Sequence, residues 1–375
     1  MSVAADPTAE PTAGVSVAEG APAFRYARVE KPEDLPAEEA RCVDVAILDL
    51  NFGWPNLGHD SIVQAVRETA SRLAAPLADA EICLRAVSFA VRDHGMLPAP
   101  PGGGRFAVYV GSGGPGHVDP RRNDGVSEFS QGVREDPAWE RTAFALFDAI
   151  RDDPGAALLT VCHSFGVLCR WAGIAEPVLR GAAKGGKRSG VFEDVLSTAA
   201  LDHPWFSRLA VHLPDGRHLR VLENRLFDLV PLPGAHPAGF LALGYERGYE
   251  RGYERGDGRD GDGLTMAELA RDAGGVMPRI LGVNSHPEIV DRIHQHRILE
   301  AKLARGEVSR AWYEERLEAL TRVYPAEDSD RRLRLTSEYT FLLPLRFHLE
   351  RQVRLRAEAR GHAADLDESR VLGLH

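Results

Sequence analysis

The chain has 375 residues, enough for one large α/β domain with an appendage or for two domains. Its 45 basic and 55 acidic residues give a formal charge of -10, which argues against a general nucleic-acid or anionic-membrane surface and leaves small molecules as the default ligands. The four cysteines form neither a CxxC pair nor a disulfide framework, and no signal-peptide pattern or long apolar run is present, so we expect a cytoplasmic protein.

Order is expected to begin some way into the chain. Residues 1–23 are rich in Ala, Pro, Thr and Glu, and we expect a disordered tail there. The apolar run VDVAILDL at Val43–Leu50 is typical of a buried parallel strand. Further strands are predicted at Ile82–Phe89, Phe106–Val110 and Ala157–Val161, and helices at Asn56–Leu73, Trp139–Ile150 and Phe165–Ala172. This alternation predicts an α/β fold with a doubly wound, mostly parallel sheet, whose active groups gather at the carboxyl ends of the strands.

The last third of the chain contains a repeat and two long helical patterns. The segment GYERGYERGYERGDGRDGDG at 244–263 has no apolar face, so it predicts a flexible surface loop. A Ca²⁺-binding tract is the alternative, although the closing Glu of an EF-hand loop is missing. Residues 291–375 are predicted to form a helical C-terminal extension, with one helix over Ile289–Arg322 broken near Gly306 and another over Ser337–Arg360 kinked at Pro344.

Cys162 lies directly after a predicted strand, in LLTVCHSFG. A cysteine nucleophile needs a base that takes its proton and a third group that orients the base. His286 and Glu288, in GVNSHPE, lie two residues apart and leave an extended segment on the same side. We therefore predict a catalytic triad of Cys162, His286 and Glu288. The alternatives are an inert buried thiol and a structural histidine.

A glycine loop, YVGSGGPG at 109–116, follows another predicted strand. Consecutive glycines let backbone N–H groups face a ligand, so Gly113 or Gly114 could stabilise an oxyanion together with the N–H of His163. A plain turn at the end of a strand is the alternative. Phosphate binding is a weaker interpretation, because the Lys-Ser/Thr ending of a P-loop is missing.

The three motifs, in this order, resemble the class I (triad) glutamine amidotransferases over residues 43–290. The resemblance implies a flavodoxin-like core, a thioester mechanism without cofactor or metal, and a substrate pocket shaped by Ser164, Phe165 and Gly166. HPWFSRL and LFDLVPLPGAHPAGFLA are similar to the family's later strands. The chain has Thr160 and Ser164 where the family usually has glycine, and Gly166 where it commonly has a glutamine.

These features predict a glutamine amidotransferase-like amide hydrolase, with glutamine or an analogue as the first candidate substrate. No synthase domain is fused to the chain, so released ammonia would pass to a separate synthase subunit. The C-terminal helices would provide that contact, a homo-oligomer contact, or a cap over the site. Two alternatives stay open: an acyltransferase of the homoserine-succinylating type, which resembles the family in fold and triad, and a non-catalytic scaffold.

Overall fold

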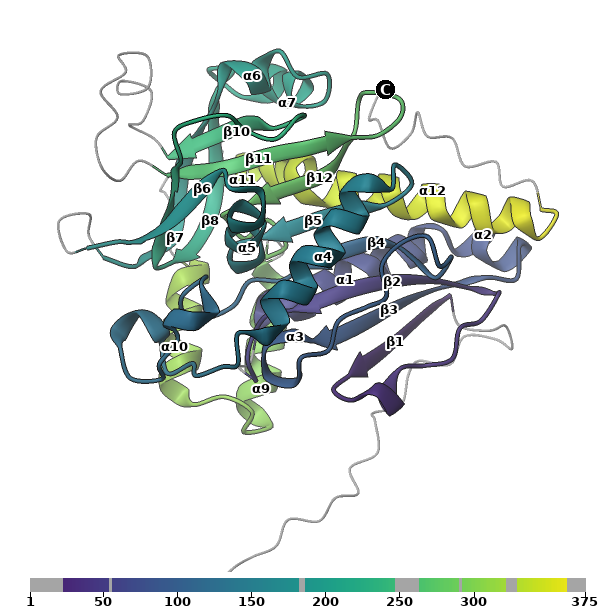
Figure 1. The fold of residues 1–375 in the computed structure, drawn as a ribbon, viewed down its shortest axis with the longest axis horizontal. Helices are drawn as coiled ribbons and strands as arrows, with labels where there is room; N and C mark the ends of the chain where they lie inside the picture. The colour runs from purple at the N-terminus through teal and green to yellow at the C-terminus, as the bar shows by residue number, and fades with distance from the viewer. Residues whose placement is uncertain are drawn as a thin grey trace, which may run out of the picture.

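The computed structural model of the protein describes residues 23–53, 56–181, 186–246, 263–289, 292–321 and 329–362 (Figure 1). The strands are β1 (Phe24–Val29), β2 (Cys42–Asp49), β3 (Cys83–Ala90), β4 (Phe106–Gly111), β5 (Ala157–Val161), β6 (Ala175–Leu179), β7 (Arg188–Leu196), β8 (His218–Arg225), β9 (Phe227–Pro231), β10 (Leu241–Glu246), β11 (Leu264–Arg271) and β12 (Pro278–Val283).

The α-helices are α1 (Leu57–Arg72), α2 (Ala74–Asp79), α3 (Val91–His94), α4 (Ala138–Asp152), α5 (His163–Ala172), α6 (Thr198–Leu201), α7 (Phe206–His212), α9 (Arg292–Ala304), α10 (Arg310–Thr321), α11 (Ser329–Ser337) and α12 (Leu343–Ala359). Short 3₁₀ turns η1 (Pro32–Asp34), η2 (Pro120–Arg122) and η3 (Glu128–Ser130) and one π-helical segment, η5 (Glu338–Leu342), complete the described elements. No helix in the described ranges is both long and apolar enough to cross a bilayer.

A 10-stranded sheet organises the molecule, in the order β1-β3-β2-β4-β5-β12-β11-β10-β7-β8. The strands from β1 to β12 in this order pair in parallel, whereas β11, β10, β7 and β8 extend the sheet in antiparallel pairs. The stretch β3-β2-β4-β5-β12 has the flavodoxin-like strand order of doubly wound folds. The predicted fold class is confirmed.

Alternating side chains of the parallel strands divide the interior into two cores. Val45 and Ile47 point into one core together with apolar residues of α1 and α12, and Ala46 and Leu48 point into the other with residues of α4 and α5. Figure 1 shows the two pairs of helices on opposite faces of the sheet. Because helices cover both faces of the sheet, the parallel strands have apolar residues on both sides and appear in the sequence as continuous apolar runs.

Most of the predicted elements are present within one or two residues of their expected bounds. Strand β5 has the predicted bounds, and α1 begins where the Asn56 side chain accepts a hydrogen bond from the N–H of Gly58 at 2.7 Å. The predicted break near Gly306 separates α9 from α10, and Gly306 has a φ of +72°. Pro344 closely follows the π-helical turn η5, so its missing N–H falls where the α-helical hydrogen-bond pattern is already interrupted.

Two expectations about the elements need correction. The sheet begins before residue 43, because β1 pairs in parallel with β3 at the sheet edge. The segment HPWFSRL contributes to helix α7 and not to a strand, since Pro204 favours a helix start and the His203 ring accepts the N–H of Trp205 at 3.0 Å. The predicted C-terminal helices are present, and α12 buries Phe347 and Val353 in the same core as α1.

The first copy of the GYER repeat belongs to the sheet, because Gly244, Tyr245 and Glu246 lie in β10 and pair with β7. Glu246 accepts from Arg180 and Arg225, each at 3.0 Å, within a buried ion cluster. The cluster comprises Arg180, Arg188, Asp194, Glu223, Arg225, Asp228 and Glu246. The rest of the repeat, the Ca²⁺ alternative and the tail predicted for residues 1–23 lie outside the described residues, except for Ala23 and Gly263.

Candidate active site

Cys162 lies at the carboxyl end of β5, on the turn into α5, with φ 51° and ψ -105°. A residue other than glycine pays a steric cost at such a positive φ, which persists only where surrounding contacts fix the backbone. Here the N–H of Cys162 donates to the carbonyl of Val283 at 2.8 Å, and its carbonyl accepts from Gly166 at 3.0 Å. The strained turn holds the thiol at the carboxyl edge of the sheet.

The space for this turn comes from the neighbouring strands. A side chain at Gly111 in β4 would place its Cβ 2.5 Å from Cβ of Ser164, and one at Gly282 in β12 would meet Oγ1 of Thr160 at 2.6 Å. The Ser164 hydroxyl also accepts from the N–H of Val161 at 2.8 Å. The glycines that the family usually has beside the nucleophile are therefore matched here by glycines on the two flanking strands.

His286 and Glu288 follow β12 and face the turn. Nδ1 of His286 lies 2.8 Å from Oε1 of Glu288, whose side chain is fully buried. The backbone N–H of His286 donates to the backbone carbonyl of Leu222 at 2.7 Å, and this hydrogen bond anchors the segment to β8. Burial alone would lower the pKa of His286, but the charges of Glu288 and Cys162, with hydrogen bonds to both, outweigh it and raise that pKa to about 10. His286 is therefore hydrogen-bonded to Glu288, and both His286 and Cys162 line the same pocket.

The predicted glycine loop passes directly over Cys162 and His286. A Cβ at Gly113 would lie 2.8 Å from Cε1 of His286, and a Cβ at Gly114 would lie 2.1 Å from the carbonyl oxygen of Leu50. Neither position can accept a side chain without a shift of the loop, and a Cβ at Gly113 would also lie 3.6 Å from Cβ of Cys162. The role of the Gly113, Gly114 and His163 backbone N–H groups at an oxyanion stays a prediction.

A buried ion pair holds the loop in place, and sequence reasoning did not find it. Arg92 donates to the carbonyls of Pro115 at 2.6 Å and Leu50 at 3.0 Å, and it pairs with Glu135 through two nitrogens. Both side chains are fully buried. Arg92 and Glu135 are distant in sequence from each other and from the loop, so no local pattern could have indicated them.

His163 is also buried beside the loop. Burial, then the charges of Arg92 and His117, lower the pKa of His163 well below its usual value, so its ring is neutral. Its Nε2 has no hydrogen-bond partner among the described residues, and the ring lines the pocket described below. The ring therefore offers an unused polar atom close to the predicted oxyanion site.

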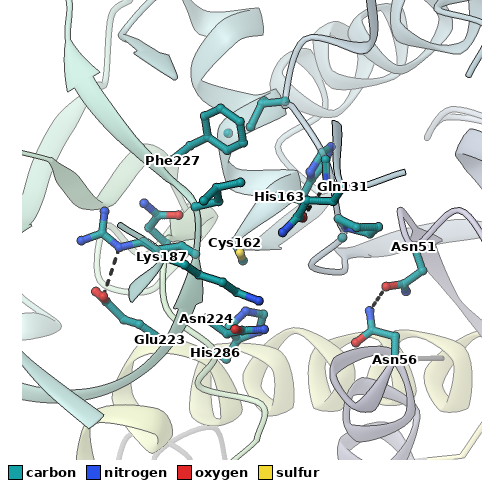
Figure 2. A pocket seen from close by; sticks show the side chains of 18 of the residues that line it. Asn51, Asn56, Gln131, Cys162, His163, Lys187, Glu223, Asn224, Phe227 and His286 are labelled. Carbon is teal, nitrogen blue, oxygen red and sulfur yellow. Dashed lines mark hydrogen bonds and ion pairs between the residues drawn. The ribbon is translucent and has the colours of Figure 1, made fainter. Parts of the chain in front are cut away.

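The pocket beside Cys162 has about 1120 Å³ of empty space, its open mouth included. Figure 2 shows Lys187, Glu223 and Asn224 on one side of Cys162, and Asn51 and Asn56 on the other. The wall is formed by the glycine loop, the start of α5, β8 with the turn after it, the end of β12, and α10. Its apolar members are Leu57, Val118, Leu222, Leu226, Phe227, Leu229, Ile289 and Trp312.

Of the three residues expected to shape the substrate pocket, only Gly166 does so. Ser164 is fully buried with its hydroxyl on the backbone of Val161, and Phe165 is fully buried against Gly282. These two expectations are wrong, because both side chains point between the helix and the sheet. Gly166 faces Val118, whose Cγ2 would lie 2.7 Å from a Cβ at position 166.

The sequence matches no protein-family model and no curated protein. Solved structures show a distant likeness, among them the following two. A Thermoplasma acidophilum protein described as a GMP synthase subunit has 13% identity and a TM-score of 0.37, over 65% of this chain and 85% of its own. The glutaminase domain of Trypanosoma brucei CTP synthase, solved with bound acivicin, has 9% identity and a TM-score of 0.36, over 66% of this chain and 87% of its own. Similarity at this level concerns the general α/β architecture only.

Proposed function

We propose that the chain is an amide hydrolase of the class I glutamine amidotransferase type, with Cys162 as the nucleophile. The observation that supports it most directly is the contact series from Cys162 through His286 to Glu288 at one end of a pocket. A strained strand-to-helix turn that exposes a nucleophile beside a buried base is typical of acyl-transfer enzymes.

The mechanism follows from the roles of these groups. The Cys162 sulfur attacks the carbonyl carbon of the amide, while His286 holds the thiol proton. The oxyanion that forms is stabilised by backbone N–H groups of the glycine loop and of His163. The C–N bond then breaks as His286 gives its proton to the leaving nitrogen, which departs as ammonia or an amine. Water, deprotonated by His286, hydrolyses the thioester and restores the thiol.

Glu288 orients His286 and stabilises its protonated form, which forms when the ring takes a proton from the thiol or from water. Its Oε1 accepts from Nδ1 of the ring, so the other ring nitrogen faces the sulfur. Gly58 is required at the start of α1, since a Cβ there would lie 2.7 Å from Oε1 of Glu288. We propose that released ammonia is used by a separate synthase subunit, as the resemblance implies.

The proposal is tested with a glutamine-mimicking electrophile, diazo-oxo-norleucine, and with neutral iodoacetamide, each followed by mass mapping. We expect iodoacetamide to modify Cys162 and His286→Ala to slow this reaction, because the base is lost. Cys169, which is fully buried, is the internal control and should stay unmodified. A Cys162 that reacts no faster in the wild type than in His286→Ala would contradict the proposal and favour a scaffold.

Diazo-oxo-norleucine then reports on the substrate. Modification of Cys162 together with ammonia release from glutamine would support a glutaminase. Modification by iodoacetamide alone, with consumption of acyl-CoA in the presence of an amino acid, would instead support the acyltransferase alternative. Both assays use the full-length chain, with Cys162→Ser as the blank.

A further inference from the structure

The carboxylate of Glu288 is fully buried and has a single charged partner. Within the described part of the chain it pairs with His286 alone, and its Oε2 is buried without a hydrogen bond. In the proposed mechanism His286 gives its proton to the leaving nitrogen, so the carboxylate then stands without a cation beside it. A buried charge in that state is costly unless another positive group lies near it.

The amino end of α1 supplies such a group. A Cβ at Gly58, in the first turn of this 16-residue helix, would lie 2.7 Å from Oε1 of Glu288. The unpaired N–H groups of a helix's first turn carry a partial positive charge, which favours an anion placed beside them. Unlike the charge of His286, this partial charge does not change as protons move during the reaction.

A series of hydrogen bonds fixes the position of that helix end. The Asn56 side chain accepts from the N–H of Gly58 at 2.7 Å, and its Nδ2 donates to Oδ1 of Asn51 (Figure 2). The backbone N–H of Asn51 in turn donates to Asp49 at 3.3 Å, and Asp49 pairs with Arg28 at 2.7 Å. The start of α1 is thus tied to the ends of β2 and β1.

The other charged groups around this helix end have partners of their own. Asp60, in the first turn of α1, pairs with Lys302 of α9 at 2.9 Å and contacts Nδ1 of His59 at 3.2 Å. Asp49 forms the ion pair described above. These charges offset one another, so they leave the interaction of the helix end with Glu288 in place.

We propose that Asn56 is a positioning residue of the triad: by capping α1 it holds the helix end against Glu288, which in turn holds the His286 ring toward Cys162. The inference rests on the proposed function of Cys162 as a reactive thiol. Because Asn56 also lines the pocket, a direct contact with the substrate is the competing explanation, and the experiment must separate the two.

The test follows the rate at which neutral iodoacetamide alkylates Cys162 in the full-length chain, measured by mass spectrometry between pH 5 and pH 10. In this reaction the sulfur bonds to the methylene carbon, iodide leaves, and the thiol proton passes to His286. Asn56→Ala, which removes the cap, should react about three- to tenfold more slowly than the wild type at pH 7. Asn56→Ser should restore the rate to within about twofold, because serine caps a helix as well as asparagine does.

Asn56→Asp keeps the cap and adds a charge. Oδ1 of Asn56 lies 3.1 Å, and Oε1 of Glu288 2.7 Å, from one point, the Cβ position at Gly58. The two oxygens therefore lie within the roughly 6 Å over which a like charge acts on a neighbouring ionisable group. The added carboxylate favours the protonated forms of the thiol and of His286, so the midpoint of the rate plotted against pH should rise by about 0.5 to 1 pH unit. A cap that only stabilised the fold would leave this midpoint unchanged.

Two controls separate positioning from a loss of stability and from direct contact. Ser197 caps α6, where its hydroxyl accepts from the N–H of Ala200 at 3.1 Å, and it does not line the pocket. Ser197→Ala should lower the melting temperature, as Asn56→Ala does, but label at the wild-type rate. In a His286→Ala background, Asn56→Ala should cause no further loss of rate, because its effect passes through His286.

The outcomes separate this inference from the proposed function. Slower labelling of Asn56→Ala, recovery in Asn56→Ser and a raised midpoint in Asn56→Asp together support it. It is overturned if Asn56→Ala labels like the wild type, if Asn56→Ser is as slow as Asn56→Ala, or if the midpoint of Asn56→Asp does not move. An equal loss in the His286→Ala background also overturns it, since that result indicates direct contact. In all these cases the proposed function stands while the wild type labels faster than His286→Ala; a wild type that is no faster overturns both.

Discussion

Gly166 and Val118 form a tight contact whose energy can be measured by a double-mutant cycle. In Gly166→Gln the new Cβ would lie 2.7 Å and 2.8 Å from the two Cγ atoms of Val118. Carbon atoms normally approach to about 3.5 to 4.0 Å, so the contact is too short by about 0.8 Å, and such overpacking costs about 1 to 3 kcal/mol. Val118→Ala removes two buried methyl groups and costs about 2 kcal/mol in transfer and cavity energy.

The double variant should therefore be less destabilised than the sum of the two single variants. We expect an interaction energy of at least about 1 kcal/mol in the stabilising direction, because the smaller side chain of Val118→Ala gives the added glutamine its room. Urea unfolding of the wild type, both single variants and the double variant measures it. Gly103→Gln is the control for adding a glutamine, since no atom lies within 4 Å of a Cβ at that position.

The same cycle reports on the substrate pocket. Gly166→Gln alone should not hydrolyse glutamine better than the wild type, because Val118 crowds the added side chain. The double variant is the form in which a glutamine at 166 could contact a substrate amide. The reasoning is refuted if Gly166→Gln unfolds within about 0.5 kcal/mol of the wild type, or if the two changes are simply additive.

Three further predictions concern other parts of the molecule. Cys162→Ala should lose all turnover, and Cys162→Gly should in addition be about 1 kcal/mol more stable than Cys162→Ala in urea, because glycine accepts the positive φ without strain. Burial and repulsion from Glu223 raise the pKa of Asp194 to about 8, so the folded state keeps a proton that the unfolded state loses. Its contribution to stability is thus fully present below about pH 4 and lost as the pH rises to about 8, by at most about 1.4 kcal/mol per pH unit; Asp194→Asn should flatten this slope in thermal melts, and an unchanged slope would contradict the assignment. Arg92→Met should cost about 3 to 5 kcal/mol because Glu135 is left buried without its partner, and Arg92→Met with Glu135→Gln should recover part of the loss; no recovery would show that the backbone contacts of Arg92 dominate.

The sequence indicated where those groups of the candidate site lie that depend on local pattern. A buried strand reads as a continuous apolar run, so β5 and the position of Cys162 at its end could be placed directly. The spacing of His286 and Glu288 was sufficient because the hydrogen bond joins residues of one short segment. The glycine loop was recognised by composition, and the structure shows that neither Gly113 nor Gly114 can accept a side chain in place.

What the sequence did not predict depends on contacts between distant segments. Strand β1 is short and half exposed, and only pairing with β3 makes it part of the sheet. The pair of Arg92 with Glu135 and the place of Trp312 at the pocket wall arise from packing, which no pattern of neighbours contains. Ser164 and Phe165 were misassigned because the side on which a helical residue emerges depends on how α5 sits against Gly282.

The glycines at 111 and 282 have a consequence for how such proteins are found. A sharply turned nucleophile needs space around it, and side chains of three adjacent strands can fill that space. Glycines on the two neighbouring strands can therefore leave the room that glycines in the turn itself would otherwise provide. A search pattern that demands glycine two residues before and after the cysteine would pass over a chain built in this way. A pattern that sums side-chain volume across the three strands would retain it, and it would also predict that Gly111 and Gly282 resist substitution as strongly as the flanking glycines do elsewhere.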